Sequence, residues 1–282
     1  MHILARVARQ LAEAYPLGEA RALARWALED GFGLSQTDIL MGKDTELSAD
    51  DHMRLQNIVG RLVAGEPLQY IVGHAPFLGR RFGVRPGVLI PRPETEDLVR
   101  LILSQPAPTL PPQAHVLDIG TGSGCIALSL ALELADAVSV TAWDISPEAL
   151  AVARENAGRL GAAVRFEQQD VLHPTPDARR WHLIVSNPPY VRQSEAREMA
   201  SNVLDHEPHL ALFVPDDDAL RFYRAIARYA QDHLHPGGWL CFEINRYLAD
   251  ETAEMLRQMR YRQVTVHPDL HNHSRFILCQ HP

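Results

Sequence analysis

The residues best suited to chemistry form the stretch Ser-Asn-Pro-Pro-Tyr at positions 186–190. Each proline fixes its φ angle near about −65° and lacks an N–H group, and Pro189 also restricts Pro188, so this loop should be rigid. The side-chain oxygen of Asn187 and the backbone oxygen of Pro188 could then accept two N–H bonds from one planar –NH2 group, while the ring of Tyr190 stacks on it. The alternative is an ordinary proline-rich turn, because Asn-Pro is a common turn signal.

A second candidate site is the glycine-rich stretch at positions 120–124, between a predicted strand over 115–119 and an apolar helix over 125–134. Glycines at alternate positions let the backbone pass close to a ligand and open the helix N-terminus toward it. Cys125 stands at the sixth position and no Lys-Ser/Thr pair follows, so the pattern matches neither the dehydrogenase fingerprint nor the P-loop. A structural tight turn is the alternative. The candidate binding residues are Gly120, Thr121, Gly122, Ser123 and Gly124.

Two carboxylates follow the next predicted strands. Asp144 lies about 20 residues beyond the glycines, where an acidic residue can bind both hydroxyls of a ribose. It could instead cap the helix that begins near Pro147, although Ser146 is the better cap. Asp170 could accept a hydrogen bond from the exocyclic amine of adenine while Val171 packs on the ring. A simple turn carboxylate is the alternative for Asp170.

The elements that must position these residues follow the order strand, glycine turn, helix, strand-Asp, helix, strand-Asp, strand-Asn-Pro-Pro-Tyr. This order predicts a doubly wound parallel sheet, in which ligands bind at the carboxyl ends of the strands. All the polar motifs share that location. Further elements are predicted as helices over 220–229 and 250–259 and strands at 239–244, 264–266 and 276–278. The predicted fold class is α/β, a Rossmann-like sheet with a small N-terminal helical domain.

The first part of the chain predicts helices. Apolar residues recur at helical spacing over 4–12 and 20–28, and Gly31 and Gly33 should break the second helix. A third helix is expected after Ser48 as its N-cap.

The middle of the chain predicts short extended pieces from Pro67 onward, with a hairpin turn at 79–81. Thr95 or a neighbour should cap a helix, and a proline-rich connector is expected over 105–113. The predicted domains are a helical domain over 1–75, a hairpin and linker over 76–113, and the sheet domain over 114–282.

Composition excludes several classes of function. The formal net charge of −8 disfavours a polyanion, so no stable nucleic-acid partner is expected. The single lysine, Lys43, lies in no motif for Schiff-base or Walker chemistry. No apolar run reaches about 18 residues and no signal peptide is evident, so we expect no membrane span and a cytoplasmic location.

The potential metal ligands lack metal-site spacing. Three cysteines stand far apart in sequence, and we expect them to be core residues rather than a disulfide framework or a zinc site. The histidines His267, His271 and His273 are expected on the surface. The cysteines are Cys125, Cys241 and Cys279.

Several of these motifs resemble those of a known family. Residues 116–124 resemble the first motif of class I S-adenosylmethionine-dependent methyltransferases, and residues 187–190 resemble the motif of those that methylate amides or amines. More specifically, residues 70–73, 77–82 and 88–96, the last containing Pro-Arg-Pro-Glu-Thr-Glu, resemble the release factor glutamine methyltransferases of the PrmC/HemK family. The resemblance covers nearly the whole chain.

The resemblance implies an S-adenosylmethionine-dependent protein-(glutamine-N(5)) methyltransferase that modifies the glutamine of the Gly-Gly-Gln motif in class I peptide chain release factors. It implies that residues 120–124, Asp144, Asp170 and Val171 bind the cofactor and that Asn187 contacts both cofactor and substrate. A monomer is expected, with the helical domain docking the substrate. The implied catalytic residues are Asn187, Pro188 and Tyr190, which together with Pro189 would bind the substrate.

Two positions depart from the family pattern. The family usually has a glycine at the position of Asn245, after Glu-Ile, and often a glycine pair at Val214 and Pro215. An alternative function is a nucleic-acid amino-methyltransferase acting on adenine or guanine, because those bases also present an –NH2 group. That function predicts a basic groove. A third reading is a cofactor-binding scaffold without catalytic activity.

Overall fold

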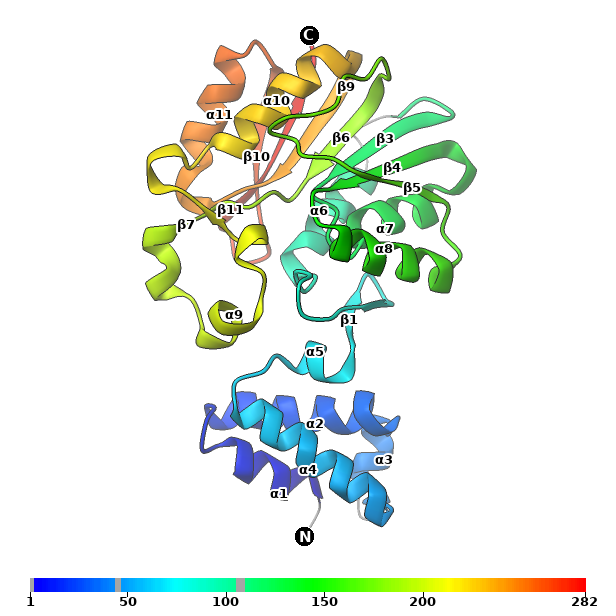
Figure 1. Ribbon diagram of the computed structural model, residues 1–282, viewed down its shortest axis with the longest axis vertical. Coiled ribbons are helices and arrows are strands. Elements are labelled where there is room, and N and C mark those ends of the chain that lie inside the picture. Colours follow the sequence, from blue (N-terminus) through cyan, green and yellow to red (C-terminus); the bar gives the residue numbers. More distant parts are fainter. Residues whose placement is uncertain (1–2, 44–46, 105–109) are drawn as a thin grey trace. The chain divides into compact units, whose positions relative to one another are not determined.

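The computed structural model of the protein describes residues 3–43, 47–104 and 110–282 (Figure 1). Residues 105–109 of the predicted connector lie outside the described residues. The chain forms two compact units: Met1–His74 with Ala200–His206, and Ala75–Met199 with Glu207–Pro282. The predicted helical domain over 1–75 did not include the short second segment of the first unit.

The larger unit is built on a seven-stranded sheet in the order β10-β11-β9-β6-β3-β4-β5. From β3 the chain adds β4 and β5 on one side, and then β6 and β9 on the other, all parallel. At the β9 edge, β11 runs antiparallel to both of its neighbours, β9 and the edge strand β10. The sheet is therefore doubly wound, as predicted, with its switch point between β3 and β6. The strands are β3 (Ala114–Ile119), β4 (Val138–Asp144), β5 (Val164–Gln168), β6 (Trp181–Ser186), β9 (Leu234–Glu243), β10 (Arg262–Pro268) and β11 (Ser274–Gln280).

Helices cover both faces of this sheet (Figure 1). Side chains alternate along each strand, so Leu117 packs in the cluster with α10 and α11, whereas Val116 packs in the cluster with α6, α7 and α8. Burying each such side chain stabilises the fold by roughly 1.5–3 kcal/mol. The helices are α6 (Pro93–Leu103), α7 (Cys125–Leu134), α8 (Pro147–Leu160), α10 (Arg221–His233) and α11 (Ala249–Gln258).

Short elements join these layers. The predicted hairpin exists, but its turn is at Leu78 and Gly79, whose φ angles are 46° and 72°, and Arg80 and Arg81 belong to the second strand. The short elements are β1 (His74–Phe77), β2 (Arg80–Gly83), β7 (Val191–Arg192), β8 (Phe213–Val214), η2 (Ala135–Ala137), η3 (Gln193–Glu198), η4 (His209–Ala211), η5 (Asp216–Asp218) and η6 (Arg246–Leu248).

The smaller unit is helical. Ser48 caps α4 as predicted, since its hydroxyl accepts the N–H of Asp51 at 3.1 Å. The prediction that Gly31 ends the second helix was wrong, because this residue lies inside α2, where an added Cβ would come within 3.3 Å of Ile58. The helix ends at Gly33, with φ 68°. The helices are α1 (Ile3–Leu11), α2 (Leu17–Phe32), α3 (Gln36–Leu40), α4 (Ala49–Val63), α5 (Leu68–Val72) and α9 (Ser201–His206).

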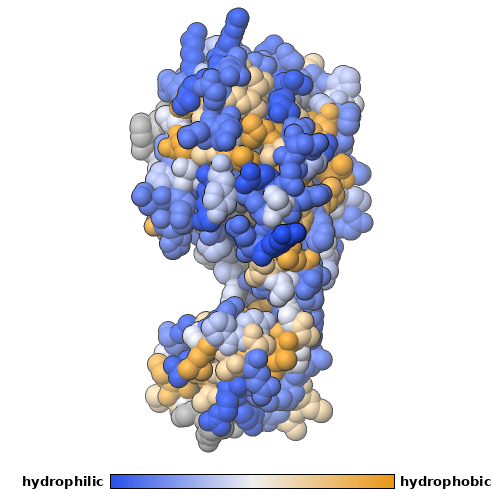
Figure 2. All heavy atoms as spheres, turned by 90° about the vertical axis from the view of Figure 1, so that its left-hand side faces the viewer, coloured by the Kyte–Doolittle hydropathy of each residue, from blue (hydrophilic) through white to orange (hydrophobic). Residues whose placement is uncertain are grey.

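The surfaces are mainly hydrophilic with scattered apolar residues on the face drawn in Figure 2. Within the described ranges no helix is both long and apolar enough to cross a membrane. The three cysteines are buried and free, as predicted. His271 and His273 are exposed and His267 is half-buried. No cluster of potential metal ligands occurs among the residues that the structure describes.

Candidate active site

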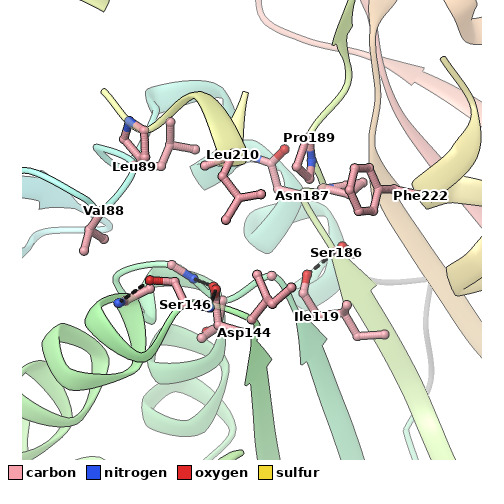
Figure 3. Close-up of a pocket in the computed structure, with 18 of the residues that line it drawn as sticks. Val88, Leu89, Ile119, Asp144, Ser146, Ser186, Asn187, Pro189, Leu210 and Phe222 are labelled. Carbon is pink, nitrogen blue, oxygen red and sulfur yellow. Dashed lines mark hydrogen bonds between the residues drawn. The ribbon is translucent and has the colours of Figure 1, made fainter. Parts of the chain in front are cut away.

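A cavity of about 340 Å³ lies at the carboxyl ends of β3, β4, β5 and β6 (Figure 3). The parallel register aligns these ends, because Ile119 lies opposite both Trp143 and Ser186. Gly124 and Tyr190, two of the predicted site residues, are outside the lining. The predicted residues that line the cavity are Gly120, Thr121, Gly122, Ser123, Asp144, Asp170, Val171, Asn187, Pro188 and Pro189.

The glycine turn forms the floor beside β3. Gly120 and Gly122 have φ angles of 75° and 55°, which other residues rarely adopt. An added Cβ on Gly122 would meet no atom within 4 Å, so the backbone here is open to a ligand. Gly124 has a packing role instead, because a Cβ there would approach Leu128 to 3.0 Å.

Asp144 connects two backbone segments of the cavity. Its Oδ2 accepts the N–H of Gly122 at 2.8 Å and its Oδ1 accepts the N–H of Ser146 at 2.9 Å. Ser146 is the helix cap, since its hydroxyl accepts the N–H of Ala149 at 3.1 Å. Burial raises the pKa of Asp144, although these backbone N–H groups oppose the shift. Each carboxylate oxygen keeps a lone pair for a ligand hydroxyl.

Asp170 is also positioned by its own loop. Its Oδ1 accepts the N–H of Leu172 at 2.9 Å, and its Oδ2 lies 3.0 Å from Nδ1 of His173. Burial alone would raise the pKa of Asp170, but hydrogen bonds from His173 and Leu172 outweigh it and keep this pKa below its ordinary value. Asp170 therefore stays an acceptor.

Asn187 follows β6, whose last residue, Ser186, donates its hydroxyl to the carbonyl of Ile119 at 2.6 Å. The side-chain Nδ2 of Asn187 donates to Oγ1 of Thr95 at 3.2 Å. A cap of α6 was predicted at Thr95 or at a neighbouring residue. Thr95 itself is not the N-cap. The cap position belongs to Arg92, whose side chain makes no capping hydrogen bond, whereas Thr95 lies inside the helix with 2% of its surface exposed.

Glu243, the last residue of β9, forms hydrogen bonds to residues of this site and was not predicted as a site residue from the sequence. It accepts hydrogen bonds from the hydroxyls of Thr95, at 2.7 Å, and Tyr190, at 3.0 Å. The expected stacking of the Tyr190 ring on a bound amide stays a prediction, because here its hydroxyl faces Glu243. The sequence signal that could have identified Glu243 is a charged residue directly after the apolar residues 239–242.

Asp118 was missed as well, although it is an acidic residue inside the buried strand before the glycines. Its Oδ2 accepts bonds from the Thr121 hydroxyl, at 2.6 Å, and the Ala127 N–H, at 3.2 Å. Its buried Oδ1 has no partner among the described residues. Burial raises the pKa of Asp118 to about 7, and the charge of Asp144 adds to the shift.

One positively charged side chain at the margin of the cavity, Arg92, is held by Glu207. Its Nη2 donates to Oε1 of Glu207 at 2.6 Å, while the N–H of Ile90 donates to Oε2 at 3.0 Å. The Glu207 side chain is 1% exposed. Apolar side chains, among them Leu89, Leu210 and Phe222, complete the walls (Figure 3).

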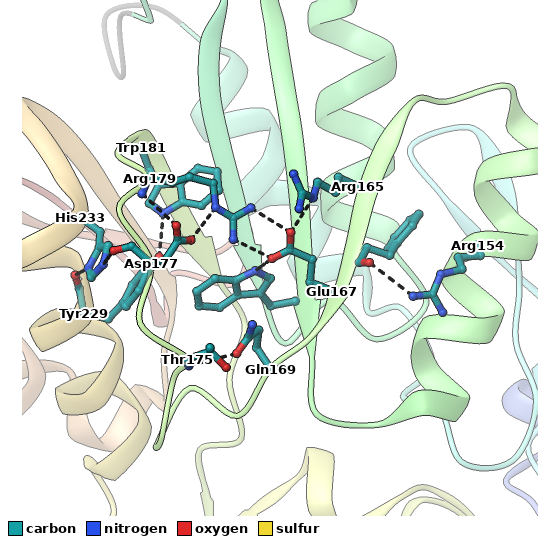
Figure 4. Close-up of polar contacts among 12 residues, drawn as sticks. Arg154, Arg165, Glu167, Gln169, Thr175, Asp177, Arg179, Trp181, Tyr229 and His233 are labelled. Atoms are coloured by element: carbon teal, nitrogen blue, oxygen red, sulfur yellow. Dashed lines mark hydrogen bonds and ion pairs between the residues drawn. The ribbon is translucent and has the colours of Figure 1, made fainter.

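A polar cluster away from the cavity joins β5 to the segment before β6 (Figure 4). Both oxygens of Glu167 accept bonds from Arg179, at 2.9 and 2.7 Å, and one also accepts from Nε1 of Trp143 at 2.9 Å. Arg179 also pairs with Asp177. These charges satisfy one another, so the cluster stabilises the segment that begins at Asp170 rather than forming a second site.

Comparison with known proteins gives consistent matches. Residues 2–73 match the family model of the PrmC N-terminal domain, and residues 98–210 match that of the methyltransferase small domain. A release factor glutamine methyltransferase from Bacteroides thetaiotaomicron is 49% identical over 276 residues, 98% of this chain and 98% of that protein. One from Flavobacterium psychrophilum is 41% identical over 89% of this chain and 88% of that protein.

Solved structures show the same fold at low identity. A methyltransferase from Pyrococcus furiosus is similar with a TM-score of 0.52 and 17% identity, over 83% of this chain and 98% of that chain. A 16S rRNA methyltransferase (RsmC) from T. thermophilus, solved with AdoMet and guanosine, has a TM-score of 0.53 and 18% identity, over 74% of this chain and 50% of that chain.

Proposed function

The chain belongs to the release factor glutamine methyltransferase family, and from this premise we propose that it methylates the side-chain nitrogen N(5) of a release factor glutamine, using S-adenosylmethionine. We assign that glutamine to the Gly-Gly-Gln motif of class I peptide chain release factors. The observation that carries the proposal is the position of Asn187, which lines the same cavity as the glycine turn, Asp144 and Asp170.

The residues on the β3 to β5 side fit S-adenosylmethionine, which when bound supplies an electrophilic methyl group. The open backbone at Gly122 accommodates close approach of the ligand. Asp144 can still accept hydrogen bonds from ribose hydroxyls. Asp170 can accept one from the amine of adenine, and Val171 would then pack on the adenine ring.

The residues on the β6 side fit a carboxamide. An amide nitrogen is a poor nucleophile because its lone pair is delocalised, so it must be held and polarised. Oδ1 of Asn187 and the carbonyl of Pro188 would accept its two N–H groups, orient the nitrogen, and favour the positive charge that develops on it. No histidine occurs among the described residues that line the cavity. The proton can leave after transfer, so no general base is required.

The remaining assignments follow the same function. The release factor is the protein partner, and we place the enzyme in the cytoplasm as a monomer, with the N-terminal helical unit docking the substrate. The net charge of −8 supports a protein substrate over a stable nucleic-acid partner, and so argues against an adenine or guanine amino-methyltransferase. Similarity to an rRNA methyltransferase at 18% identity concerns the fold alone.

A methyl-transfer assay tests this function. The purified protein, labelled S-adenosylmethionine and a purified class I release factor should give label on the release factor. Label should be absent when alanine replaces the glutamine of the Gly-Gly-Gln motif in that substrate, because no carboxamide then enters the cavity. Transfer to RNA or DNA in place of the release factor would contradict the proposal.

A further inference from the structure

Three side chains from separate elements form a continuous series of hydrogen bonds beside the cavity. Nδ2 of Asn187 donates to Oγ1 of Thr95 at 3.2 Å, and Oγ1 of Thr95 donates to Oε2 of Glu243 at 2.7 Å. Thr95 and Glu243 are 2% and 1% exposed. Because these buried groups have little water to replace a lost partner, breaking one bond leaves its neighbours unsatisfied.

The donor and acceptor roles in this series follow from Glu243. Oγ1 of Thr95 donates its single proton to Oε2 of Glu243, and the hydroxyl of Tyr190 donates to Oε1, so both oxygens of this buried side chain act as acceptors. The lone pairs of Oγ1 then remain for a donor, and the amide of Asn187 must present Nδ2 to Thr95 rather than Oδ1. Oδ1, the acceptor needed for the substrate, therefore stays on the side of Asn187 away from Thr95.

The other carboxylate oxygen holds the far end of the same loop. Oε1 of Glu243 accepts the hydroxyl of Tyr190 at 3.0 Å, and Nδ2 of Asn245 donates to the carbonyl of Tyr190 at 3.0 Å. Asn245 also bonds Glu195 at 2.9 Å. The end of β9 thus holds the loop at Asn187, through Thr95, and at Tyr190 directly. Asn245, which departs from the family pattern, adds a partly buried bond at this place.

We infer that Thr95 and Glu243 are positioning residues that fix the amide orientation of Asn187, so that its oxygen and not its nitrogen meets the substrate carboxamide. The inference rests on the proposed function. It assigns a role to Thr95 in the segment Pro-Arg-Pro-Glu-Thr-Glu and to the carboxylate that ends β9. Neither residue needs to touch the reacting atoms.

The direct test is Thr95→Val, which keeps the shape of the side chain and removes the hydroxyl. Without that acceptor the amide of Asn187 can rotate, so kcat for methylation of the release factor should fall about 10- to 100-fold. Cofactor affinity, measured by calorimetry, should change little, because the glycine turn and Asp144 are untouched. Thr95→Ser restores the hydroxyl and should restore most of kcat.

Thr252→Val is the matched control. Thr252 is a buried threonine of α11 whose hydroxyl donates to the carbonyl of Leu248 at 2.6 Å. Its substitution should lower the melting temperature and leave kcat unchanged. An equal effect of Thr95→Val and Thr252→Val on kcat would overturn the inference, as would a Thr95→Ser variant as slow as Thr95→Val.

A double variant tests whether Thr95 and Glu243 act as one unit. Glu243→Gln introduces a donor and should also lower kcat, yet Thr95→Val combined with Glu243→Gln should be little worse than the slower single variant. Losses that multiply would contradict a shared role. If the wild-type enzyme labelled no release factor, the proposed function and this inference would both fall. Full activity of Thr95→Val in an assay where the wild type works would overturn this inference alone.

Discussion

Two buried carboxylates, Asp118 within β3 and Glu243 at the end of β9, differ in how their oxygens are hydrogen-bonded. Glu243 receives hydrogen bonds at both oxygens, from Thr95 and Tyr190. Asp118 receives both of its bonds at one oxygen and leaves the other without a partner in the described part of the chain. A buried carboxylate in that state favours its protonated form, which makes Asp118 sensitive to pH.

The raised pKa of Asp118, about 7, predicts a specific pH dependence of stability. The folded protein keeps this proton up to about pH 7, whereas the unfolded chain releases it near about pH 4, so the free energy of unfolding falls as pH rises between these values, by at most about 1.4 kcal/mol per pH unit. Asp118→Asn keeps an acceptor oxygen and removes the ionisation. Thermal unfolding from pH 5 to pH 8 should therefore show a shallower fall for the variant.

The control for that experiment is Asp136→Asn, at an exposed carboxylate in η2. This variant should keep the pH dependence of the wild type. If Asp118→Asn followed the wild-type curve, the buried carboxylate would not be the group that titrates.

At the scale of elements, the loops that carry the site are stabilised from outside it. The segment that begins with Asp170 is joined to β5 by the bonds of Arg179 to Glu167 (Figure 4). The hydrogen bonds from Arg179 lower the pKa of Glu167, and burial opposes this shift. A carboxylate with a lowered folded pKa stabilises the fold above its unfolded pKa, and this contribution is lost as pH falls through the folded value.

Glu167→Gln should accordingly lower the free energy of unfolding at pH 7 by about 1 kcal/mol, after allowance for solvent screening at the partly exposed Arg179. The difference from the wild type should shrink as pH falls below the ordinary range of a glutamate, because the pKa of Glu167 lies under that range. Denaturant unfolding at pH 7 and pH 3.5 measures both effects. Glu155→Gln, at an exposed pair with Arg85, should leave stability unchanged, and an equal loss there would contradict the assignment.

Much of the sheet domain could be predicted from the sequence because its signals are local. The helix over 125–134 was predicted with the observed bounds, and the cap at Ser146 followed from side-chain chemistry. Gly31 was wrongly predicted to end its helix, because the need for glycine there comes from a tertiary contact, the close approach to Ile58. The prediction of extended structure from Pro67 onward was wrong at residues 68–72, which form the helix α5, because five residues hold less than two turns of periodic pattern.

The site was predictable only in part, for the same reason. Gly120, Asp144 and Asn187 could be grouped because each follows a strand and strand ends converge in a parallel sheet. Thr95 and Glu243 are separated from Asn187 by 92 and 56 positions in the sequence, and only the folded chain brings them together. The hydroxyl of Tyr190 likewise found a partner that no local pattern indicates.

At the scale of the whole molecule, the doubly wound sheet of the larger unit brings the strand ends of its two halves to one cavity, and we propose that one half binds the cofactor and the other the substrate. The strands on one side of the switch point supply the glycine turn and two carboxylates, and β6 supplies the Asn-Pro-Pro-Tyr loop. Asn187 stands where the two halves meet. We propose that the side-chain oxygen of Asn187 holds the substrate carboxamide for methyl transfer.

The most direct measurement is single-turnover methyl transfer from S-adenosylmethionine to a class I release factor by Asn187→Ala, with calorimetric cofactor binding on the same sample. Loss of an acceptor aimed at the developing charge should slow transfer about 10²- to 10³-fold while cofactor affinity changes little. Mass spectrometry should place the wild-type methyl group on the glutamine of the Gly-Gly-Gln motif. Transfer by Asn187→Ala at the wild-type rate, or methylation at another residue, would contradict the account.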